Sequence, residues 1–265
     1  LENNKVKQLK LLNNYWKDFM KIDTALILAG GRGTRFLELT SSIPKPMIEA
    51  AGKPLLLHII DIYQKKSNVK NFYILAGYKK EVISDFFENN DNYELIAKNS
   101  YKSNKEQVIN ILDTGQETMT GGRVMLALKE FDSPSFHLTY GDGVSTIDIN
   151  DLERFHLETN KLATVTTVNP KPRWGKLEIK NDLVTEFTEK KVVNGDWINA
   201  GFFVLNRGIE NYLNNLDEPF EKKPLQKLAK SGQLAAYKHS GYWQCVDTIR
   251  ELEILEKDIE NGDYK

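Results

Sequence analysis

Apolar and polar positions follow one another along this chain in short blocks, and the blocks predict strands that alternate with helices. Compact apolar runs are typical of buried strands, whereas apolar residues three or four apart are typical of helices that bury one face. Strand-like runs occupy residues 24–28, 71–76, 107–112 and 136–140. The helical pattern occupies residues 54–64, 79–87, 122–131 and 151–158.

The pattern changes after about residue 162. Strand-like runs then dominate, at 163–168, 176–179, 184–188 and 198–205, and helical periodicity returns at 224–230 and 248–259. Strands that alternate with helices form βαβ units. The sequence therefore predicts an α/β fold, a Rossmann-like, mixed, mostly parallel sheet flanked by helices, and residues 21–265 are expected to form one continuous domain.

Residues 1–20 stand apart from this pattern and are predicted to form a helical extension. Leu9, Leu12, Trp16 and Phe19 are three or four residues apart, so they share one face of a helix. That face could pack on its own domain, or it could meet another subunit or an upstream domain. Because the chain begins with Leu1 rather than Met, we expect a trimmed form or one module of a longer polypeptide.

Composition narrows the classes of function. The chain has 36 Lys plus Arg against 37 Asp plus Glu, a balance that gives no general attraction to nucleic acid. No apolar run approaches the roughly 20 residues of a membrane-spanning helix, and no signal-peptide pattern opens the chain. A single cysteine, Cys245, cannot form an internal disulfide, which favours a reducing compartment and predicts a cytoplasmic location.

A glycine-rich loop follows the first predicted strand. Its residues are Ala29, Gly30, Gly31, Arg32, Gly33, Thr34 and Arg35. Glycines let a backbone turn tightly and bring its N–H groups to phosphate oxygens, and an arginine adds a cationic fork that suits phosphate. The spacing matches neither a Walker A loop nor the dinucleotide fingerprint.

A stiff segment with one lysine comes shortly afterwards, Pro44-Lys45-Pro46-Met47. Proline fixes the backbone on either side of Lys45. On its own the segment could be a rigid surface turn with a solvated lysine. Its position just after the glycine loop favours a lysine held at the phosphates beside Arg35.

These two motifs in order resemble the sugar-nucleotide pyrophosphorylases, which transfer a nucleotidyl group to sugar 1-phosphates. Four later segments are similar to the cytidylyltransferase branch that acts on glucose 1-phosphate, namely residues 113–123, 139–144, 198–206 and 243–248. Each segment alone is weak, but the ordered set, from about residue 24 to about residue 257, is specific. The resemblance implies a fold of the nucleotide-diphospho-sugar transferase type, with a nucleotide-binding first half and an acceptor-binding second half.

The resemblance also implies a magnesium site at Asp142 and Asp247. Mg²⁺ prefers hard oxygen ligands, often one or two carboxylates together with substrate phosphates. Asp142 lies in a Gly-Asp-Gly turn and could simply be a turn former. Asp247 could instead be the N-cap of the helix predicted at 248–259.

The nucleotide, CTP, would be held by the glycine loop, the lysine segment and a Thr-Gly-Gly-Arg helix start. The residues implied are Ala29, Gly30, Gly31, Gly33, Thr34, Arg35, Lys45, Thr120, Gly121, Arg123 and Asp142, with Arg35 and Lys45 as catalytic cations. The segment from Thr120 to Arg123 would meet the cytosine ring, whose edge Arg123 and backbone groups would recognise. The alternative is a threonine-capped helix start with a solvated arginine.

The acceptor would be bound by Tyr140, Glu189, Lys190 and Asn199, with Lys190 on its phosphate. Alternatively, Glu189 and Lys190 could be an ordinary exposed charged pair. The chain departs from relatives at Lys191, where they carry proline, and at Trp174, where they carry a different aromatic residue. The segment before Asp113 also looks shorter than in the glucose enzymes, so another phosphorylated acceptor stays possible.

The sequence as a whole predicts a Mg²⁺-dependent nucleotidyltransferase that transfers CMP from CTP to a sugar 1-phosphate, with glucose 1-phosphate the first choice, and releases pyrophosphate. Alternatives keep the chemistry and change the acceptor or the triphosphate to dTTP, UTP or GTP. A non-catalytic nucleotide-binding subunit is a further alternative. The expected partners are these small molecules and, by resemblance, a second copy in a homo-oligomer.

Overall fold

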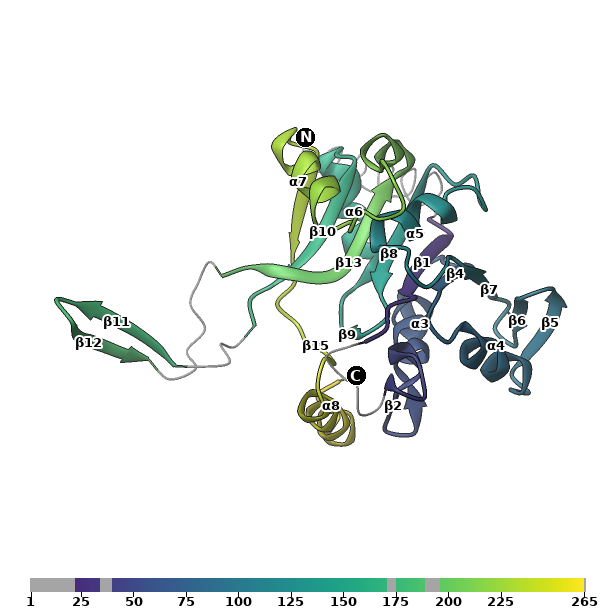
Figure 1. Ribbon diagram of the computed structural model, residues 1–265, viewed down its shortest axis with the longest axis horizontal. Helices are drawn as coiled ribbons and strands as arrows, with labels where there is room; N and C mark the ends of the chain where they lie inside the picture. The colour runs from purple at the N-terminus through teal and green to yellow at the C-terminus, as the bar shows by residue number, and fades with distance from the viewer. Residues whose placement is uncertain (1–21, 34–39, 171–174, 189–195, 265) are drawn as a thin grey trace, which may run out of the picture.

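A nine-stranded sheet forms the centre of the computed structural model, which describes residues 22–33, 40–170, 175–188 and 196–264 (Figure 1). Its strands, in spatial order, are β14 (Leu234–Lys238), β10 (Ala163–Val168), β13 (Ile198–Asn206), β8 (Ser135–Tyr140), β1 (Thr24–Ala29), β4 (Asn71–Ala76), β7 (Val108–Asp113), β6 (Ser100–Ser103) and β5 (Tyr93–Ala97). Strands β13 and β6 run opposite to the other strands of this sheet. The predicted mixed, mostly parallel α/β sheet is confirmed.

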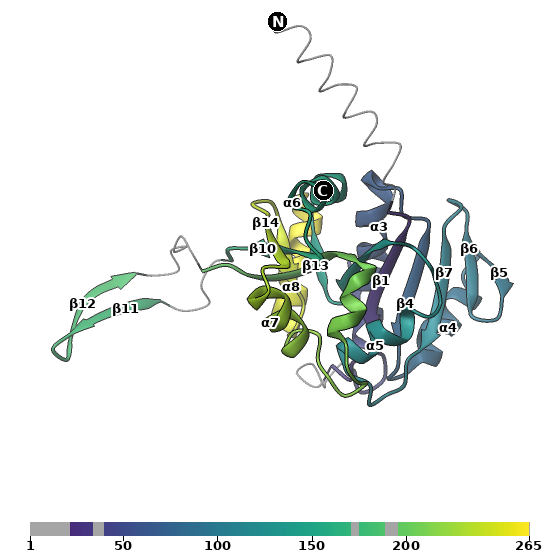
Figure 2. The same cartoon turned by 90° about the horizontal axis from the view of Figure 1, so that it is seen from above.

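Helices cover both faces of this sheet (Figure 2). One core is built on α3 (Leu55–Lys66), α4 (Lys80–Glu88), α6 (Ile149–Thr159) and α8 (Ile249–Asn261). The other is built on α5 (Thr120–Ala127), the 3₁₀ helix η3 (Arg207–Tyr212) and α7 (Lys223–Lys230). Strand β1 is buried at every position, and its alternate side chains enter the two cores, Ile27 on one side and Leu26 on the other.

Three two-stranded ribbons complete the described sheets. They are β2 (Glu49–Ala50) with β3 (Lys53–Pro54), β9 (Gly143–Ser145) with β15 (Trp243–Cys245), and β11 (Lys176–Lys180) with β12 (Leu183–Thr188). The β9–β15 ribbon lies beside the body, whereas β11–β12 extends away from it (Figures 1 and 2).

Several element boundaries differ from the sequence predictions. The helix expected at 122–131 begins two residues earlier and ends at Ala127. Gly121 and Gly122 lie in its first turn, where the backbone of residues 216–220 approaches so closely that glycine is needed: a β-carbon on Gly122 would lie 2.4 Å from the carbonyl oxygen of Leu216. Strands β5, β6 and β14 were not predicted; β5 and β14 form the edges of the sheet, where apolar periodicity is weak.

Two expectations lie partly or wholly outside the described residues. The helix predicted in residues 1–20 is one, and the single continuous domain at 21–265 stays a prediction as well. Within the described ranges, each helix is too short or too polar to cross a membrane.

Leu26→Ala should destabilise the protein, because Leu26 is fully buried in the central strand. Removing such a side chain typically costs about 2–5 kcal/mol. Leu95→Ala is the matched control, since Leu95 is 56% exposed on edge strand β5 and its loss should change the free energy of unfolding by less than about 0.5 kcal/mol. Urea unfolding of both variants measures this difference, and similar losses would contradict the assignment of β1 to the core.

Candidate active site

Four parallel strand ends meet at one edge of the sheet. Strands β8, β1, β4 and β7 are neighbours, and a glycine follows each of them within two residues. The loops are joined by backbone hydrogen bonds: Gly141 N donates to Leu28 O at 3.0 Å, and Tyr78 N donates to Gly30 O at 3.2 Å. In open α/β sheets ligands bind outside the carboxyl ends of the strands, so this edge is the candidate active site.

Lys45 lies at this edge in the short 3₁₀ helix η2 (Lys45–Met47), and its side chain is only 12% exposed. Its Nζ donates to Asp142 Oδ2 at 2.6 Å and to Asp247 Oδ1 at 2.5 Å. Burial by itself lowers the pKa of Lys45, but the attraction of Asp142 and the hydrogen bonds to both carboxylates outweigh it, so the net pKa is raised. Lys45 is therefore cationic at neutral pH, and the solvated surface lysine considered from the sequence is wrong.

The β9–β15 ribbon brings the two aspartates together from distant parts of the sequence. Gly143 pairs with Cys245, and Val246 N donates to Asp142 O at 2.9 Å. Asp142 directly precedes β9 and Asp247 follows β15, so the antiparallel pairing places both residues at the same end of the ribbon. Their carboxylates converge on Lys45 Nζ.

Asp247 does not cap helix α8, so that alternative is wrong. The N-cap is Thr248, whose Oγ1 accepts from Glu251 N at 3.3 Å. The Glu251 side chain in turn accepts from the backbone N of Asp247, one residue before the N-cap, at 2.8 Å. The helix start is thus satisfied by its neighbours, and the Asp247 carboxylate is directed at Lys45.

The two carboxylates fit a divalent cation. Carboxylate oxygens of Asp142 and Asp247 and the sulfur of Cys245 lie within 4.8 Å of one another. The Lys45 ammonium already bridges both carboxylates, which shows that the pair can share one cation. Cys245 is not suited to Mg²⁺, since burial, and then the two aspartates, raise the pKa of its thiol and keep it protonated.

Arg123 ties the strand-end loops together. Its side chain is buried, and its guanidinium donates to Gly30 O at 2.9 Å, Gly115 O at 2.9 Å and Ala76 O at 3.1 Å. These carbonyls follow or end three neighbouring strands, β1, β7 and β4. The solvated arginine considered from the sequence is therefore wrong, and contact between Arg123 and a cytosine stays a prediction.

The helix that carries Arg123 begins without the expected threonine cap. Its N-cap is Met119, which makes no side-chain capping bond. Thr120 instead donates from Oγ1 to Glu221 at 2.7 Å and accepts from Phe220 N at 2.8 Å.

Two glycines are required where the guanidinium of Arg123 lies. A β-carbon on Gly30 would lie 2.0 Å from Arg123 Nη1, and one on Gly77 would lie 2.5 Å from the same atom. A β-carbon on Gly31 would meet nothing within 4 Å. Gly30 thus admits the arginine, while Gly31 is an open position of the loop.

The predicted acceptor side is partly assembled. Tyr140, at the end of β8, accepts from Asn199 Nδ2 at 3.0 Å through its hydroxyl. Its ring lies against Gly201, where φ is +83° and a β-carbon would lie 2.7 Å from the ring. Burial, and then the negative charge of Glu221, raise the pKa of Tyr140.

Glu221 was missed by the sequence analysis. It contacts Thr120 on the predicted nucleotide side and influences Tyr140 on the acceptor side, so it lies between the two substrates' expected places. It stands in an ordinary charged stretch of sequence, and no motif distinguishes it.

Four predicted site residues lie outside the described ranges, and their roles stay predictions. They are Thr34, Arg35, Glu189 and Lys190. Lys191 and Trp174, where the chain departs from relatives, also lie outside them.

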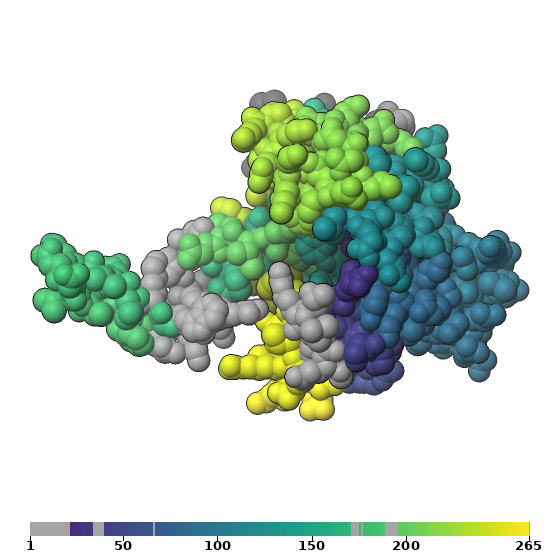
Figure 3. Space-filling view, in the orientation of Figure 1, coloured from purple at the N-terminus to yellow at the C-terminus, as the bar shows by residue number. Residues whose placement is uncertain are grey.

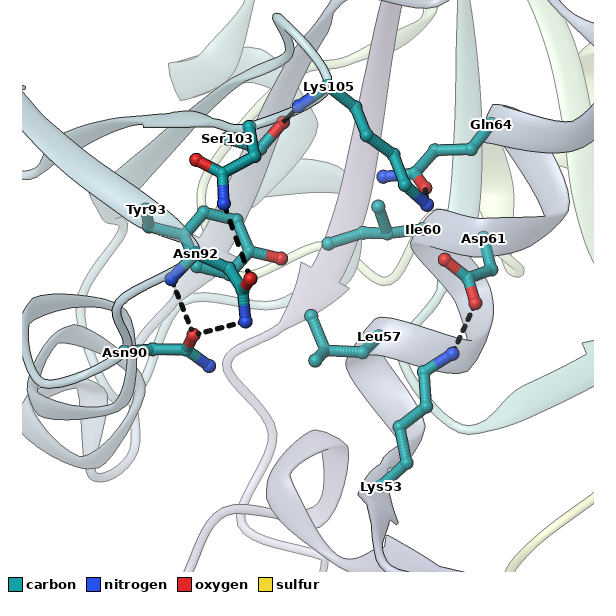
Figure 4. Close-up of a pocket in the computed structure, with 11 residues that line it drawn as sticks. Lys53, Leu57, Ile60, Asp61, Gln64, Asn90, Asn92, Tyr93, Ser103 and Lys105 are labelled. Atoms are coloured by element: carbon teal, nitrogen blue, oxygen red, sulfur yellow. Dashed lines mark hydrogen bonds and ion pairs between the residues drawn. The ribbon is translucent and has the colours of Figure 1, made fainter.

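A separate hollow of about 320 Å³ lies between α3 and the β5–β6 edge (Figure 4). Leu57, Ile60 and Tyr93 point into it, and Lys53 pairs with Asp61 at its rim. It shares no residue with the predicted site, and its polar groups largely pair with one another. The candidate active site therefore rests on the convergence of the strand ends, not on this hollow.

The chain is similar to known proteins along most of its length. Residues 24–262 match the family model described as nucleotidyl transferase. The chain is 40% identical over 248 residues to the glucose-1-phosphate cytidylyltransferase of Salmonella typhimurium, covering 90% of this chain and 96% of that protein. It is 37% identical to the probable glucose-1-phosphate cytidylyltransferase of Bacillus subtilis, with coverage of 86% and 92%.

Solved structures support the fold. HddC from Yersinia pseudotuberculosis superposes with a TM-score of 0.68 at 23% identity, covering 90% of this chain and all of that one. The CTP:phosphocholine cytidylyltransferase LicC from Streptococcus pneumoniae superposes with a TM-score of 0.61 at 18% identity, covering 90% and 100%.

Gly30→Ala should lower the free energy of unfolding by about 1–3 kcal/mol, because the new methyl group would displace the Arg123 guanidinium. Gly31→Ala, at the neighbouring open position, should change it by less than about 0.5 kcal/mol. Thermal or urea unfolding of the pair separates the two cases. Equal stability of the two variants would show that the guanidinium does not lie against Gly30.

Proposed function

The chain belongs to the nucleotidyl transferase family, and on that premise we propose that it transfers CMP from CTP to a sugar 1-phosphate and releases pyrophosphate. The observation that carries the proposal is the buried Lys45 ammonium shared by Asp142 and Asp247 at the carboxyl ends of the parallel strands. Its location is where this sheet type binds ligands.

The chemical difficulty of this reaction is the approach of two polyanions. A phosphate monoester has its second pKa near 6, so the acceptor is already largely dianionic at neutral pH and needs no general base. What the enzyme must supply is position and positive charge. Lys45 supplies a fixed cation, and we assign the same task to Arg35 on the nucleotide and Lys190 on the acceptor phosphate.

The reaction is a single displacement at the α-phosphorus of CTP. A phosphate oxygen of the acceptor attacks this atom, and the bond to the oxygen bridging the α- and β-phosphorus atoms breaks. Pyrophosphate leaves with that electron pair, and the product is a CDP-sugar. We expect the glycine loop, in which a β-carbon at Gly31 would meet nothing within 4 Å, to offer backbone N–H groups to the triphosphate.

Asp142 and Asp247 would hold the divalent metal that the family generally uses, which we take to be Mg²⁺. When bound, this ion would neutralise phosphate charge. Carboxylates occupied by the metal would leave the Lys45 ammonium available to a phosphate oxygen.

We place the base at the start of α5 and the sugar beside Tyr140 and Asn199. The choice of CTP is supported by the Thr-Gly-Gly-Arg segment and by relatives at 40% and 37% identity that are named glucose-1-phosphate cytidylyltransferases. In that arrangement Arg123 acts largely by holding the loops around the base, since the structure directs its guanidinium at three backbone carbonyls. Glucose 1-phosphate is the acceptor that those relatives' names favour.

The alternatives make distinct predictions. A different acceptor or triphosphate would keep the displacement and change the pocket around Tyr140. A non-catalytic subunit would be expected to lack the site's charged groups, whereas Lys45, Asp142 and Asp247 are present and in contact.

Pyrophosphate release with Mg²⁺, CTP and glucose 1-phosphate tests the proposal directly. We expect turnover above about 1 s⁻¹, the low end of common enzyme rates, and much slower release with UTP, dTTP or GTP. Release only with another sugar phosphate or a non-sugar phosphate would correct the acceptor. Saturable CTP binding with no release across the whole panel would refute the enzyme in favour of a binding subunit.

Lys45→Ala and Asp142→Ala should each lower turnover by roughly 10²–10³, by analogy with the cost of removing one preorganised oxyanion-hole donor. Lys53→Ala is the matched control, because Lys53 also pairs with an aspartate but lies at the separate hollow. Steady-state kinetics on folded variants measures the effect. Near-wild-type turnover of either site variant would remove that residue from the mechanism.

A further inference from the structure

Arg32 and Glu117 form an ion pair that bridges two loops of the candidate active site. Arg32 lies between Gly31 and Gly33 in the glycine loop that follows β1, and Glu117 lies in the loop between β7 and α5. The Nη2 atom of Arg32 donates to Oε1 of Glu117 at 2.5 Å, although the two residues are 85 positions apart in the sequence. Of the two arginines in the glycine loop, only Arg35 has been given a role so far.

The same two loops are joined beneath this ion pair. The buried Arg123 donates to Gly30 O in the glycine loop and to Gly115 O in the other loop, both at 2.9 Å. On the face shown in the space-filling view, purple surface from the first part of the described chain lies beside teal surface from the part that contains α5 (Figure 3). The Arg32–Glu117 pair therefore closes from the solvent side a seam that Arg123 holds from the inside.

The proposed nucleotide site crosses this seam. The base is placed at the start of α5, whose first residue, Thr120, comes three positions after Glu117. The triphosphate is placed along the glycine loop towards Lys45, and a β-carbon on Gly33 would lie 3.5 Å from the β-carbon of Lys45. Arg32 directly precedes Gly33, so it lies between the expected position of the base and the Lys45 cation.

The ion pair is weak enough to exchange its partner. The side chains of Arg32 and Glu117 are 53% and 82% exposed, and exposed ion pairs contribute little free energy because water and salt screen them. A triphosphate offers several anionic oxygens, and a guanidinium can bind phosphate through two parallel N–H donors. The Glu117 carboxylate, in contrast, would repel the same phosphates.

We infer that Arg32 is a phosphate-binding residue that exchanges Glu117 for the triphosphate when the nucleotide binds. In the empty site Glu117 holds the guanidinium across the seam, so one carboxylate and the triphosphate compete for one cation. The exchange changes no covalent bond, and the released Glu117 carboxylate is left in water. The inference rests on the proposed function for the place of the nucleotide.

Calorimetric titration of the full chain with CTP, and separately with inorganic tripolyphosphate, in Mg²⁺ and without acceptor, tests the exchange. Arg32→Gln should weaken the binding of both ligands about tenfold or more, the loss expected for one charged hydrogen-bonding group. Glu117→Gln should instead tighten the binding of both about two- to fivefold, because the competing carboxylate is gone. The double variant should bind like Arg32→Gln alone, since the effect of Glu117 requires Arg32.

Arg154→Gln is the matched control, because Arg154 is 58% exposed and pairs with Asp151 within α6, so its loss should leave both dissociation constants unchanged. The exchanged pair, Arg32→Glu with Glu117→Arg, keeps opposite charges on the two loops and should still bind CTP at least as weakly as Arg32→Gln. Recovery of wild-type affinity in the exchanged pair would overturn the inference, since the ion pair would then act only as a support for the loops.

Three other results would also overturn it. Weaker binding in Glu117→Gln would mean that the ion pair stays closed around the bound nucleotide. Unchanged binding in Arg32→Gln would mean that Arg32 does not contact the phosphates. Equal tightening by Glu117→Gln with and without Arg32 would mean that Glu117 acts only by general repulsion.

A failure of the proposed function gives a different pattern. If the chain releases no pyrophosphate but the two single variants shift tripolyphosphate binding in opposite directions, the exchange stands without the transferase. If the wild type releases pyrophosphate from CTP and Arg32→Gln leaves the KM for CTP unchanged, the transferase stands and the exchange is refuted. A wild type that binds neither CTP nor tripolyphosphate refutes the exchange as well.

Discussion

A single buried ammonium group held between two carboxylates is the interaction around which this edge of the sheet is arranged. One ammonium and two carboxylate groups in a largely buried site cost free energy unless each charge is well paired. The protein meets that requirement with rigid supports: prolines on either side of Lys45 in η2, a tight glycine turn for Asp142, and the Glu251 side chain, which accepts from the backbone N of Asp247. The β9–β15 ribbon then joins the segments that carry Asp142 and Asp247, so backbone pairing fixes the positions of the two carboxylates.

Arg123 performs a related task with neutral partners. A guanidinium has five donors in a planar fork, which suits it to collect carbonyls from several loops at once. By bonding to the carbonyls that follow or end β1, β4 and β7, it fixes the relative positions of loops that would otherwise vary independently. Reactions between two bound polyanions gain most from such positioning, since small displacements of the reacting groups reduce the rate strongly.

The sequence predicted the parallel centre of the fold well, because buried strands such as β1 appear in the sequence as continuous apolar runs followed by a glycine. It did less well at the sheet edges, where β5 is half exposed and its pattern resembles a loop. Contacts between residues far apart in the sequence were likewise predicted only in part. Asp142 and Asp247 were named as partners by resemblance, yet nothing local distinguishes Asp247 from a helix cap. Thr248 takes that role by accepting from the backbone N of Glu251. Glu221 and the buried state of Arg123 depend on tertiary contacts that no spacing encodes.

The contact of Arg123 with Gly30 and Gly77 has an evolutionary consequence. Positions 30 and 77, in two loops, and the side chain at position 123, from α5, share one volume, so a mutation at one of them changes what the others can tolerate. A side chain at position 30 becomes acceptable only after position 123 has shortened, whereas one at position 77 would still lie 2.5 Å from Gly115 O. A shortened position 123 would leave the carbonyls of Gly30, Ala76 and Gly115 without their shared donor. Drift at these sites is therefore expected to be epistatic: a path that replaces Gly30 passes through a destabilised variant that lacks the Arg123 guanidinium.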